Sequence, residues 1–318
     1  MTRILITGAG GFVGQALVRR LLAGVDALPL TQLVAVDLAL DLPTHPKLTQ
    51  LRGSVADAAV RAQALAEPPD VVFHLAAITS GQAEREFELG LTVNLRGTLE
   101  LFEDLRRQHD ATGKAARLVQ TSSIGVFGLP LPPHIDDATP IVPTMSYGAH
   151  KRMLEILLAD YSRRRWIDGR SPRLPSVVAR PGLPNGALSA FASDLIRELA
   201  AGRSYESPVD AEGTLWLLSL PACVDALIHA ATLDAERLPA TRAWTLPSLH
   251  VSVAEVVAAL MRRFGVEVSQ RLSYAPDPAI IPQFARWPTV DTALARSLGF
   301  RADASLDELI ERCLPGAA

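Results

Sequence analysis

The feature that most constrains the fold of this chain is a short apolar run, followed directly by a glycine-rich turn and a helical pattern. Residues Arg3–Thr7 (RILIT) are apolar and partly β-branched, as expected of a buried parallel strand. The turn Gly8-Ala9-Gly10-Gly11-Phe12-Val13-Gly14 comes next, and Gln15–Leu22 has a helical pattern. In such a unit the glycines allow a tight turn, close approach of a pyrophosphate and close helix packing, and the helix N-terminus offers N–H groups to phosphates. The sequence therefore predicts a dinucleotide-binding unit at this place in the chain.

An acidic residue closes the second predicted strand, which runs over Gln32–Val36 and ends in Asp37. A carboxylate there accepts hydrogen bonds from the ribose hydroxyls and repels a 2′-phosphate. No Arg or Lys follows Asp37 until Lys47. This pattern favours NAD over NADP.

Further apolar runs continue the alternation of strands and helices. The third to sixth strands are predicted over Leu48–Arg52, Val71–Leu75, Arg117–Gln120 and Ser176–Arg180. This order predicts an α/β protein with a doubly wound parallel sheet. The pattern weakens after Asn185, which indicates a smaller C-terminal part, and there Val253–Phe264 predicts an amphipathic helix.

Two predicted strands end in residues suited to a ligand site. His74-Leu75-Ala76-Ala77 closes the fourth strand, and Thr121-Ser122-Ser123 follows the fifth. Small residues and hydroxyls at the carboxyl ends of parallel strands lie where open α/β sheets bind ligands. His74 has two interpretations, a catalytic base or a strand-end histidine held by packing and hydrogen bonds, and the second is favoured.

Tyr147 and Lys151 are spaced by four residues, which places both side chains on one face of a helix. An ammonium beside a phenol favours the phenolate, so such a tyrosine can accept a proton near neutral pH. The alternative is an accidental pair on a solvated helix. The chain contains only three lysines, and no other tyrosine has a lysine four residues on.

Bulk properties describe an ordinary soluble globular protein. Of the 318 residues 48% are hydrophobic and 20% charged, and the net charge of −3 points to neither a nucleic-acid nor a membrane partner. Cys223 and Cys313 are far apart and lack metal-ligand spacing, so we expect reduced thiols and no metal site. Since neither a signal peptide nor a bilayer-spanning run is recognisable, we expect a cytoplasmic protein.

In this order the motifs resemble those of the extended short-chain dehydrogenase/reductases, the NAD-dependent epimerase/dehydratase superfamily. The resemblance covers essentially the whole chain and is carried by Gly8-x-x-Gly11-x-x-Gly14, Asp37, His74–Ala77, Asn94, Ser122-Ser123, Tyr147-x-x-x-Lys151 and Arg180-Pro181-Gly182. It implies a Rossmann domain over residues 1–180, to which 221–250 return. It also implies a smaller substrate-binding domain formed by residues 181–220 and 251–318.

The resemblance also implies roles for individual residues. Tyr147 would be the acid/base, Lys151 its activator, and Ser123, preferred to Ser122, would orient the substrate oxygen. Contacts with NAD are expected from Gly8, Gly11, Phe12, Val13, Gly14, Asp37, Ser54, Val55, Leu75, Ala76, Ala77, Asn94, Tyr147, Lys151 and Pro181. Contacts with the substrate are expected from Ser80, Gln82, Ser123, Tyr147 and Asn185. One departure stands out: the family often has an aspartate for the adenine amino group where this chain has Ser54.

Within the superfamily, the segments Ser123–Pro132, Asp160–Arg164 and Leu174–Asn185 are similar to those of the D-erythronate dehydrogenase group. That similarity implies NAD-dependent oxidation of the C2 hydroxyl of a small sugar acid to a 2-keto acid. Two other hypotheses stay open: a nucleotide-sugar epimerase or dehydratase with tightly bound NAD, and a cofactor-binding protein without chemistry. The family further implies a homodimer built from the helices that follow Asn94 and Tyr147, and Leu154, Leu158 and Tyr161 suit either that interface or the core of a monomer.

Overall fold

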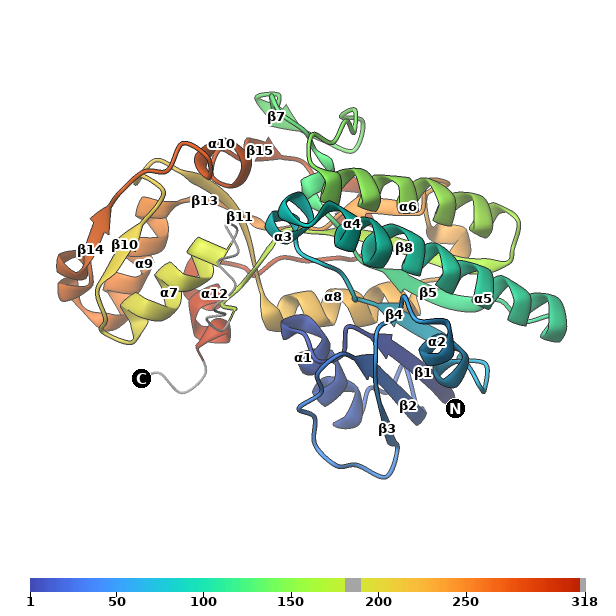
Figure 1. Ribbon diagram of the computed structural model, residues 1–318. Coiled ribbons are helices and arrows are strands. Elements are labelled where there is room, and N and C mark those ends of the chain that lie inside the picture. Colours follow the sequence, from blue (N-terminus) through green and yellow to red (C-terminus); the bar gives the residue numbers. More distant parts are fainter. Residues whose placement is uncertain (181–189, 315–318) are drawn as a thin grey trace. The chain divides into compact units, whose positions relative to one another are not determined.

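The computed structural model describes residues 1–180 and 190–314 of the chain (Figure 1). The chain divides into two compact units. The first comprises Met1–Val126, Ile141–Arg173 and Val224–Trp244. The second comprises Phe127–Pro140, Leu174–Cys223 and Thr245–Ala318. A substrate-binding role for the second unit stays a prediction.

The main sheet has the strand order of a doubly wound nucleotide-binding fold. Its strands lie in the order β3 (Leu48–Arg52), β2 (Leu30–Asp37), β1 (Thr2–Thr7), β4 (Val71–His74), β5 (Ala116–Gln120), β8 (Ile167–Leu174) and β12 (Ala243–Thr245), and β6 (Ser122–Ser123) pairs with β8. All pairings from β3 to β8 are parallel. The chain order reverses between β1 and β4, which is where such sheets bind dinucleotides. The predicted fold class is confirmed.

Helices cover both faces of this sheet. Leu5, Val72 and Leu118 form a buried cluster with side chains from α2 (Ala58–Ala64), α5 (Thr98–Thr112) and α6 (Ser146–Arg163). Arg117 points to the opposite face and donates to the carbonyl of Ala231 in α8 (Leu220–Thr232). The helices are α1 (Phe12–Leu22), α2 (Ala58–Ala64), α3 (Ser80–Arg85), α4 (Phe87–Gly90), the π-helix η1 (Leu91–Gly97), α5 (Thr98–Thr112), η2 (Ile124–Val126), α6 (Ser146–Arg163), α8 (Leu220–Thr232) and η4 (Ala235–Arg237). In the described part of the chain, no helix is long and apolar enough to cross a membrane.

The sixth strand of the main sheet was predicted at the wrong place. Ser176–Arg180 was expected there, but β9 (Ser176–Val178) pairs with β11 (Thr214–Ser219) in a separate sheet, and β8 holds the sixth position. Its sequence, IDGRSPRL, is too polar to suggest a buried strand. The polar groups are paired with distant residues: Ser171 donates to Gln120 at 3.0 Å and Arg173 binds Glu155 at 2.8 Å. Burial of β8 therefore depends on partners that the local pattern does not reveal.

The second unit is built around a three-stranded sheet in which β11 lies between β13 (Leu249–Ser252) and β9. The predicted helix over Val253–Phe264 is confirmed as α9, which begins in a capping box formed by Ser252 and Glu255. Val256 and Leu260 of α9 pack in one core with Leu195 of α7 (Phe191–Ala200). The elements are β7 (His134–Ile135), α7 (Phe191–Ala200), β10 (Tyr205–Ser207), β13 (Leu249–Ser252), η5 (Val266–Arg271), β14 (Leu272–Tyr274), α10 (Ile281–Phe284), β15 (Thr289–Val290), α11 (Ala293–Ser297) and α12 (Leu306–Cys313).

Candidate active site

Tyr147 lies in the first turn of α6 and Lys151 lies one turn further on. The Lys151 ammonium is 5.6 Å from the centre of the Tyr147 ring and donates a 2.7 Å hydrogen bond to the carbonyl oxygen of Thr121, directly after β5. Burial lowers the pKa of Lys151 to about 8, and the nearby Glu155 carboxylate opposes that shift. The ammonium is thus held beside the tyrosine ring and stays mostly charged at neutral pH.

The two serines after β5 have different partners. Ser122 is buried and its hydroxyl donates to Glu155 at 2.6 Å, whereas the Ser123 oxygen accepts from the Gly125 N–H at 3.0 Å. Because Ser123 is the acceptor in that bond, its hydroxyl proton is left to donate elsewhere. A methyl group on Gly125 would lie 3.4 Å from the Ser123 hydroxyl and 3.6 Å from the Tyr147 ring, so both side chains flank the same point.

Close backbone packing fixes the start of α6 against the segment that carries Ser123. A methyl group on Gly148 would lie 2.1 Å from the carbonyl oxygen of Gly125, so only glycine fits there. The backbone N–H of Ser146 donates to the Glu84 carboxylate of α3. The first turn of α6, with Tyr147, is therefore positioned from two sides.

The glycine-rich turn has the shape that a dinucleotide needs. Gly8 has a φ of 74°, and a methyl group there would lie 2.5 Å from the backbone nitrogen of Ala76; on Gly14 it would lie 2.1 Å from the carbonyl of Gly8. On Gly11 the nearest atom would be 3.3 Å away, so the turn has much more open space on that side. No side chain caps the N-terminus of α1, where Phe12 and Val13 lie. A phosphate can therefore approach the backbone at Gly11 and the start of α1.

Asp37 lies directly beside this turn. Its carboxylate accepts from the N–H of Gly10 at 2.9 Å and from that of Leu38 at 2.7 Å. These bonds hold a carboxylate at the carboxyl end of β2, where a cofactor ribose would lie. The turn and Asp37 together fit NAD, and they would hold its pyrophosphate and adenosine ribose.

His74 is a structural residue, which confirms the favoured interpretation. The Thr98 hydroxyl donates to the carbonyl of Asn94, so it must accept from Nε2 of His74 at 2.8 Å. Nδ1 is then the acceptor for the hydroxyl of Thr7 at 2.6 Å. Burial and the Lys151 charge lower the pKa of His74 to about 3, so the ring is neutral and both nitrogens are occupied.

Asn94 is buried in the π-helix η1 and holds the segment that follows β4. Its side chain accepts from the N–H of Ile78 at 2.7 Å and donates to the carbonyl of the same residue at 3.0 Å. Leu75, Ala76 and Ala77 lie between β4 and this anchor. Contacts of these four residues with NAD stay predictions.

The expected substrate residues are placed only in part. Ser80 and Gln82 lie in the short helix α3, where the amide of Gln82 donates to Glu86 at 3.1 Å on the surface. Pro181 and Asn185 lie outside the described residues.

Glu155 was missed as part of the site. Its carboxylate is fully buried and accepts from Ser122, from Arg173 at 2.8 and 2.9 Å, and from Arg152 at 3.0 Å. Its position one helical turn after Lys151 was a usable signal, because residues four apart share a helix face. Nothing in the local sequence indicates Arg173.

Comparison with known proteins agrees with this geometry. Residues 4–217 match the NAD dependent epimerase/dehydratase family. The chain is 40% identical over 322 residues to a D-erythronate dehydrogenase of Cupriavidus necator, covering 99% of this chain and 98% of that protein. It is 32% identical over 313 residues to a D-erythronate dehydrogenase of Haemophilus influenzae, covering 98% of each.

A solved structure, described as the nucleoside-diphosphate-sugar epimerase from Agrobacterium tumefaciens, is also similar. It has a TM-score of 0.92 and 35% identity, covering 98% of this chain and 92% of that one. The family match and the relatives point to an NAD-dependent enzyme, and the glycine turn and Asp37 fit that cofactor. The chain therefore belongs to the NAD-dependent epimerase/dehydratase family of extended short-chain dehydrogenases/reductases, and it is an NAD-dependent enzyme.

Proposed function

We propose that this enzyme oxidises the C2 hydroxyl of a small sugar acid, of the D-erythronate type, to the 2-keto acid. Two D-erythronate dehydrogenases that match the chain over nearly its full length support this substrate class. The observation that carries the chemistry is the position of Tyr147. Its ring lies beside the buried Lys151 ammonium, and the ring and the Ser123 hydroxyl both border Gly125.

The proposed reaction separates one proton and one hydride. NAD, held by the glycine-rich turn and Asp37, would supply the acceptor for the hydride that leaves C2. Tyr147 takes the proton from the substrate hydroxyl, and the Lys151 ammonium stabilises the resulting phenolate. Ser123 donates to the substrate oxygen and so holds it near Tyr147.

A nucleotide-sugar epimerase is the second candidate, because the similar structure from Agrobacterium tumefaciens carries that name. Such an enzyme must neutralise a substrate diphosphate with cationic side chains. In the C-terminal part of the chain, Arg197 and Arg203 are two cationic side chains, in α7 and just after it. Arg197 instead binds Asp194 at 2.7 Å and Glu198 at 3.0 Å, and Arg203 binds Glu198. Because acidic partners already neutralise both groups, we favour the dehydrogenase.

One assay separates the two candidates. Purified enzyme with NAD and a panel of four-carbon sugar acids is expected to produce NADH, followed by its near-ultraviolet absorbance. Tyr147→Phe is expected to abolish turnover and to leave NAD affinity nearly intact. Interconversion of UDP-sugars without net NADH, together with no turnover of any acid, would contradict the proposal.

We also propose that the enzyme is a cytoplasmic homodimer, as the family implies. Leu154, Leu158 and Tyr161, which suited either an interface or a core, are buried with the chain's own sheet. Two exposed apolar side chains, Met153 and Ile156, lie on α6, one of the two helices of the family's interface; two more, Phe87 and Leu89, lie on α4, which precedes Asn94. Exposed apolar groups on neighbouring helices suit a subunit interface.

Light scattering tests the dimer. Ile156→Glu is expected to give a monomer, because it would place a charge in the apolar contact. Val266→Glu is the control, since Val266 is also exposed but lies in the second unit. A wild-type monomer, or a dimer that Ile156→Glu leaves intact, would argue against this interface.

A further inference from the structure

The loop Gly53–Asp57 lies at the carboxyl end of β3, next to the residue expected to hold the cofactor ribose. The N–H of Gly53 donates to the carbonyl of Asp37 at 2.9 Å. The Ser54 hydroxyl accepts from the N–H of Ala56 at 3.2 Å, within the loop itself. Because Ser54 lacks the carboxylate common at this place, we expect the loop to meet the adenine mainly through its backbone.

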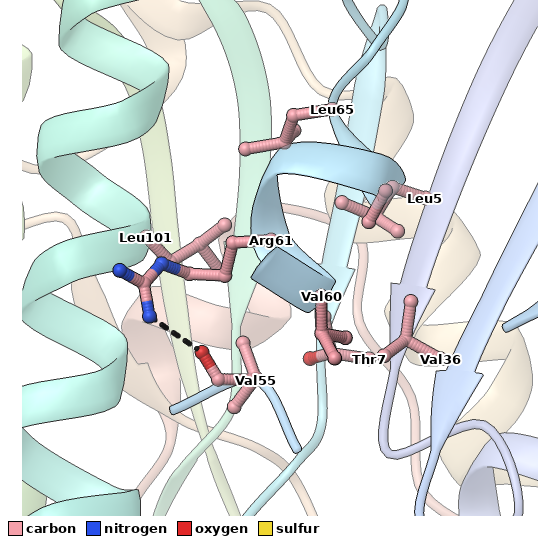
Figure 2. Close-up of a pocket in the computed structure, with 9 residues that line it drawn as sticks. Leu5, Thr7, Val36, Val55, Val60, Arg61, Leu65 and Leu101 are labelled. Atoms are coloured by element: carbon pink, nitrogen blue, oxygen red, sulfur yellow. Dashed lines mark hydrogen bonds between the residues drawn. The ribbon is translucent and has the colours of Figure 1, made fainter. Parts of the chain in front are cut away.

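Packing beneath this loop is incomplete. Figure 2 shows a small hollow under it, into which the buried Val55 side chain points. The hollow is lined by Leu5, Thr7, Val36, Val55, Val60, Arg61, Ala64, Leu65 and Leu101. Val55 still packs in the buried cluster with Leu5 and Leu101, and it loses only the few contacts that face the void.

Arg61 of α2 adds polar contacts to this packing. Its Nη1 donates to the carbonyls of Val55 and Ala56, both at 3.0 Å, and Figure 2 marks the first of these bonds. Its Nε donates to Asp104 of α5 at 2.7 Å. The Arg61 side chain is only 6% exposed, so these charge-assisted bonds are poorly screened by water. One guanidinium thus joins the loop to two helices.

We propose that Arg61 is a positioning residue for the adenine half of NAD. It acts through the Val55 and Ala56 carbonyls, which it holds so that the backbone of Ser54–Ala56 keeps the shape that the adenosine meets. Asp104 in turn orients the guanidinium. The proposal depends on the NAD dependence of the family and not on the proposed sugar acid. The role of Arg61 and the identity of the substrate can therefore be refuted independently.

The experiment measures binding by calorimetry, with NAD and with ADP-ribose, which lacks the nicotinamide. Arg61→Met keeps the apolar stem and removes the guanidinium. It is expected to raise the Kd of both ligands by the same factor, about tenfold, which corresponds to about 1.4 kcal/mol. In turnover assays the rise in KM for NAD should exceed any fall in kcat.

Arg107→Met is the matched control, because Arg107 binds the other oxygen of Asp104 from the exposed side and touches no loop carbonyl. It should leave both Kd values unchanged. If Arg61→Met fails to fold, Arg61→Lys carries the test. A compact ammonium lacks the guanidinium fork that reaches Asp104 and the loop carbonyls from separate nitrogens, so a smaller rise in both Kd values is expected.

Three results would overturn the proposal. The first is unchanged Kd values with a lowered melting temperature, which would make Arg61 a stabiliser of the fold only. The second is a weaker affinity for NAD but not for ADP-ribose, which would place the effect at the nicotinamide. The third is an equal loss of affinity in Arg107→Met.

Discussion

The Lys151 ammonium donates to the carbonyl oxygen of Thr121 at 2.7 Å, and the lysine is only 3% exposed. This bond ties the helix that carries Tyr147 to the residue that follows the fifth strand, as does the bond from Ser122 to Glu155 one residue further on. It also holds a cation in a site where burial disfavours charge. Burying the Lys151 charge beside the tyrosine lowers the folding stability of the protein.

Lys151→Met should separate activity from stability. Loss of the ammonium is expected to lower kcat/KM by about 10²- to 10⁴-fold, as for the loss of acid–base assistance. Removing the cost of burying the charge offsets the lost bond to Thr121, so the melting temperature should not fall. Steady-state kinetics and thermal melts check this, with the exposed Lys114→Met as a control expected to resemble the wild type. A poorly folded Lys151→Met protein would contradict this reading.

The same lysine predicts a dependence of stability on pH. Its pKa falls from 10.5 to about 8 on folding, so between these values the unfolded chain binds more protons and stability rises with pH. The full difference amounts to about 3 kcal/mol. Urea unfolding at several pH values should show the wild type gaining stability relative to Lys151→Met across this window. Activity should decline over the same window, because the ammonium is lost. If the unfolding free energies of the two proteins change in parallel with pH, Lys151 is not the source of the pH dependence.

Glu155→Gln should be much more damaging than Ser122→Ala. The first change leaves Arg173 without its buried ionic partner, at a cost of about 3–5 kcal/mol in unfolding free energy. The second removes one hydrogen bond to a carboxylate, at a cost of about 1.5–3 kcal/mol. Glu155 also raises the pKa of Lys151, so Glu155→Gln should move the alkaline limb of the activity profile to lower pH. Denaturation and pH profiles measure both effects, and an unmoved alkaline limb would contradict the second.

Asp37→Ala should weaken the discrimination against NADP. The substitution removes the carboxylate that would repel a 2′-phosphate, and it also leaves the N–H of Gly10 without its partner. We expect the ratio of kcat/KM for NAD to that for NADP to fall by about tenfold or more, or about 1.4 kcal/mol. Kinetics with both cofactors measure this ratio. An unchanged ratio would remove Asp37 from cofactor selection.

Local patterns predicted much of the fold. The strand, turn and helix at Arg3–Leu22, the helix α9 and the Tyr147–Lys151 spacing are all encoded by neighbours a few residues apart. β8 escaped prediction because its buried charges are neutralised by side chains such as Glu155, 18 residues before Arg173. A polar strand of this kind can be recognised only when its partners are known.

The sequence by itself determined the sheet class, the cofactor turn and the candidate base, because spacing along one strand or helix expresses these features. Only the tertiary structure decided that Ser122 is hydrogen-bonded to Glu155, 33 residues away, and that Ser123 lies close to Tyr147. It also decided that Lys151 is buried and that Arg61 supports the loop beside Asp37. These properties depend on solvent exclusion and on partners distant in sequence, which form only when the strands and helices come together.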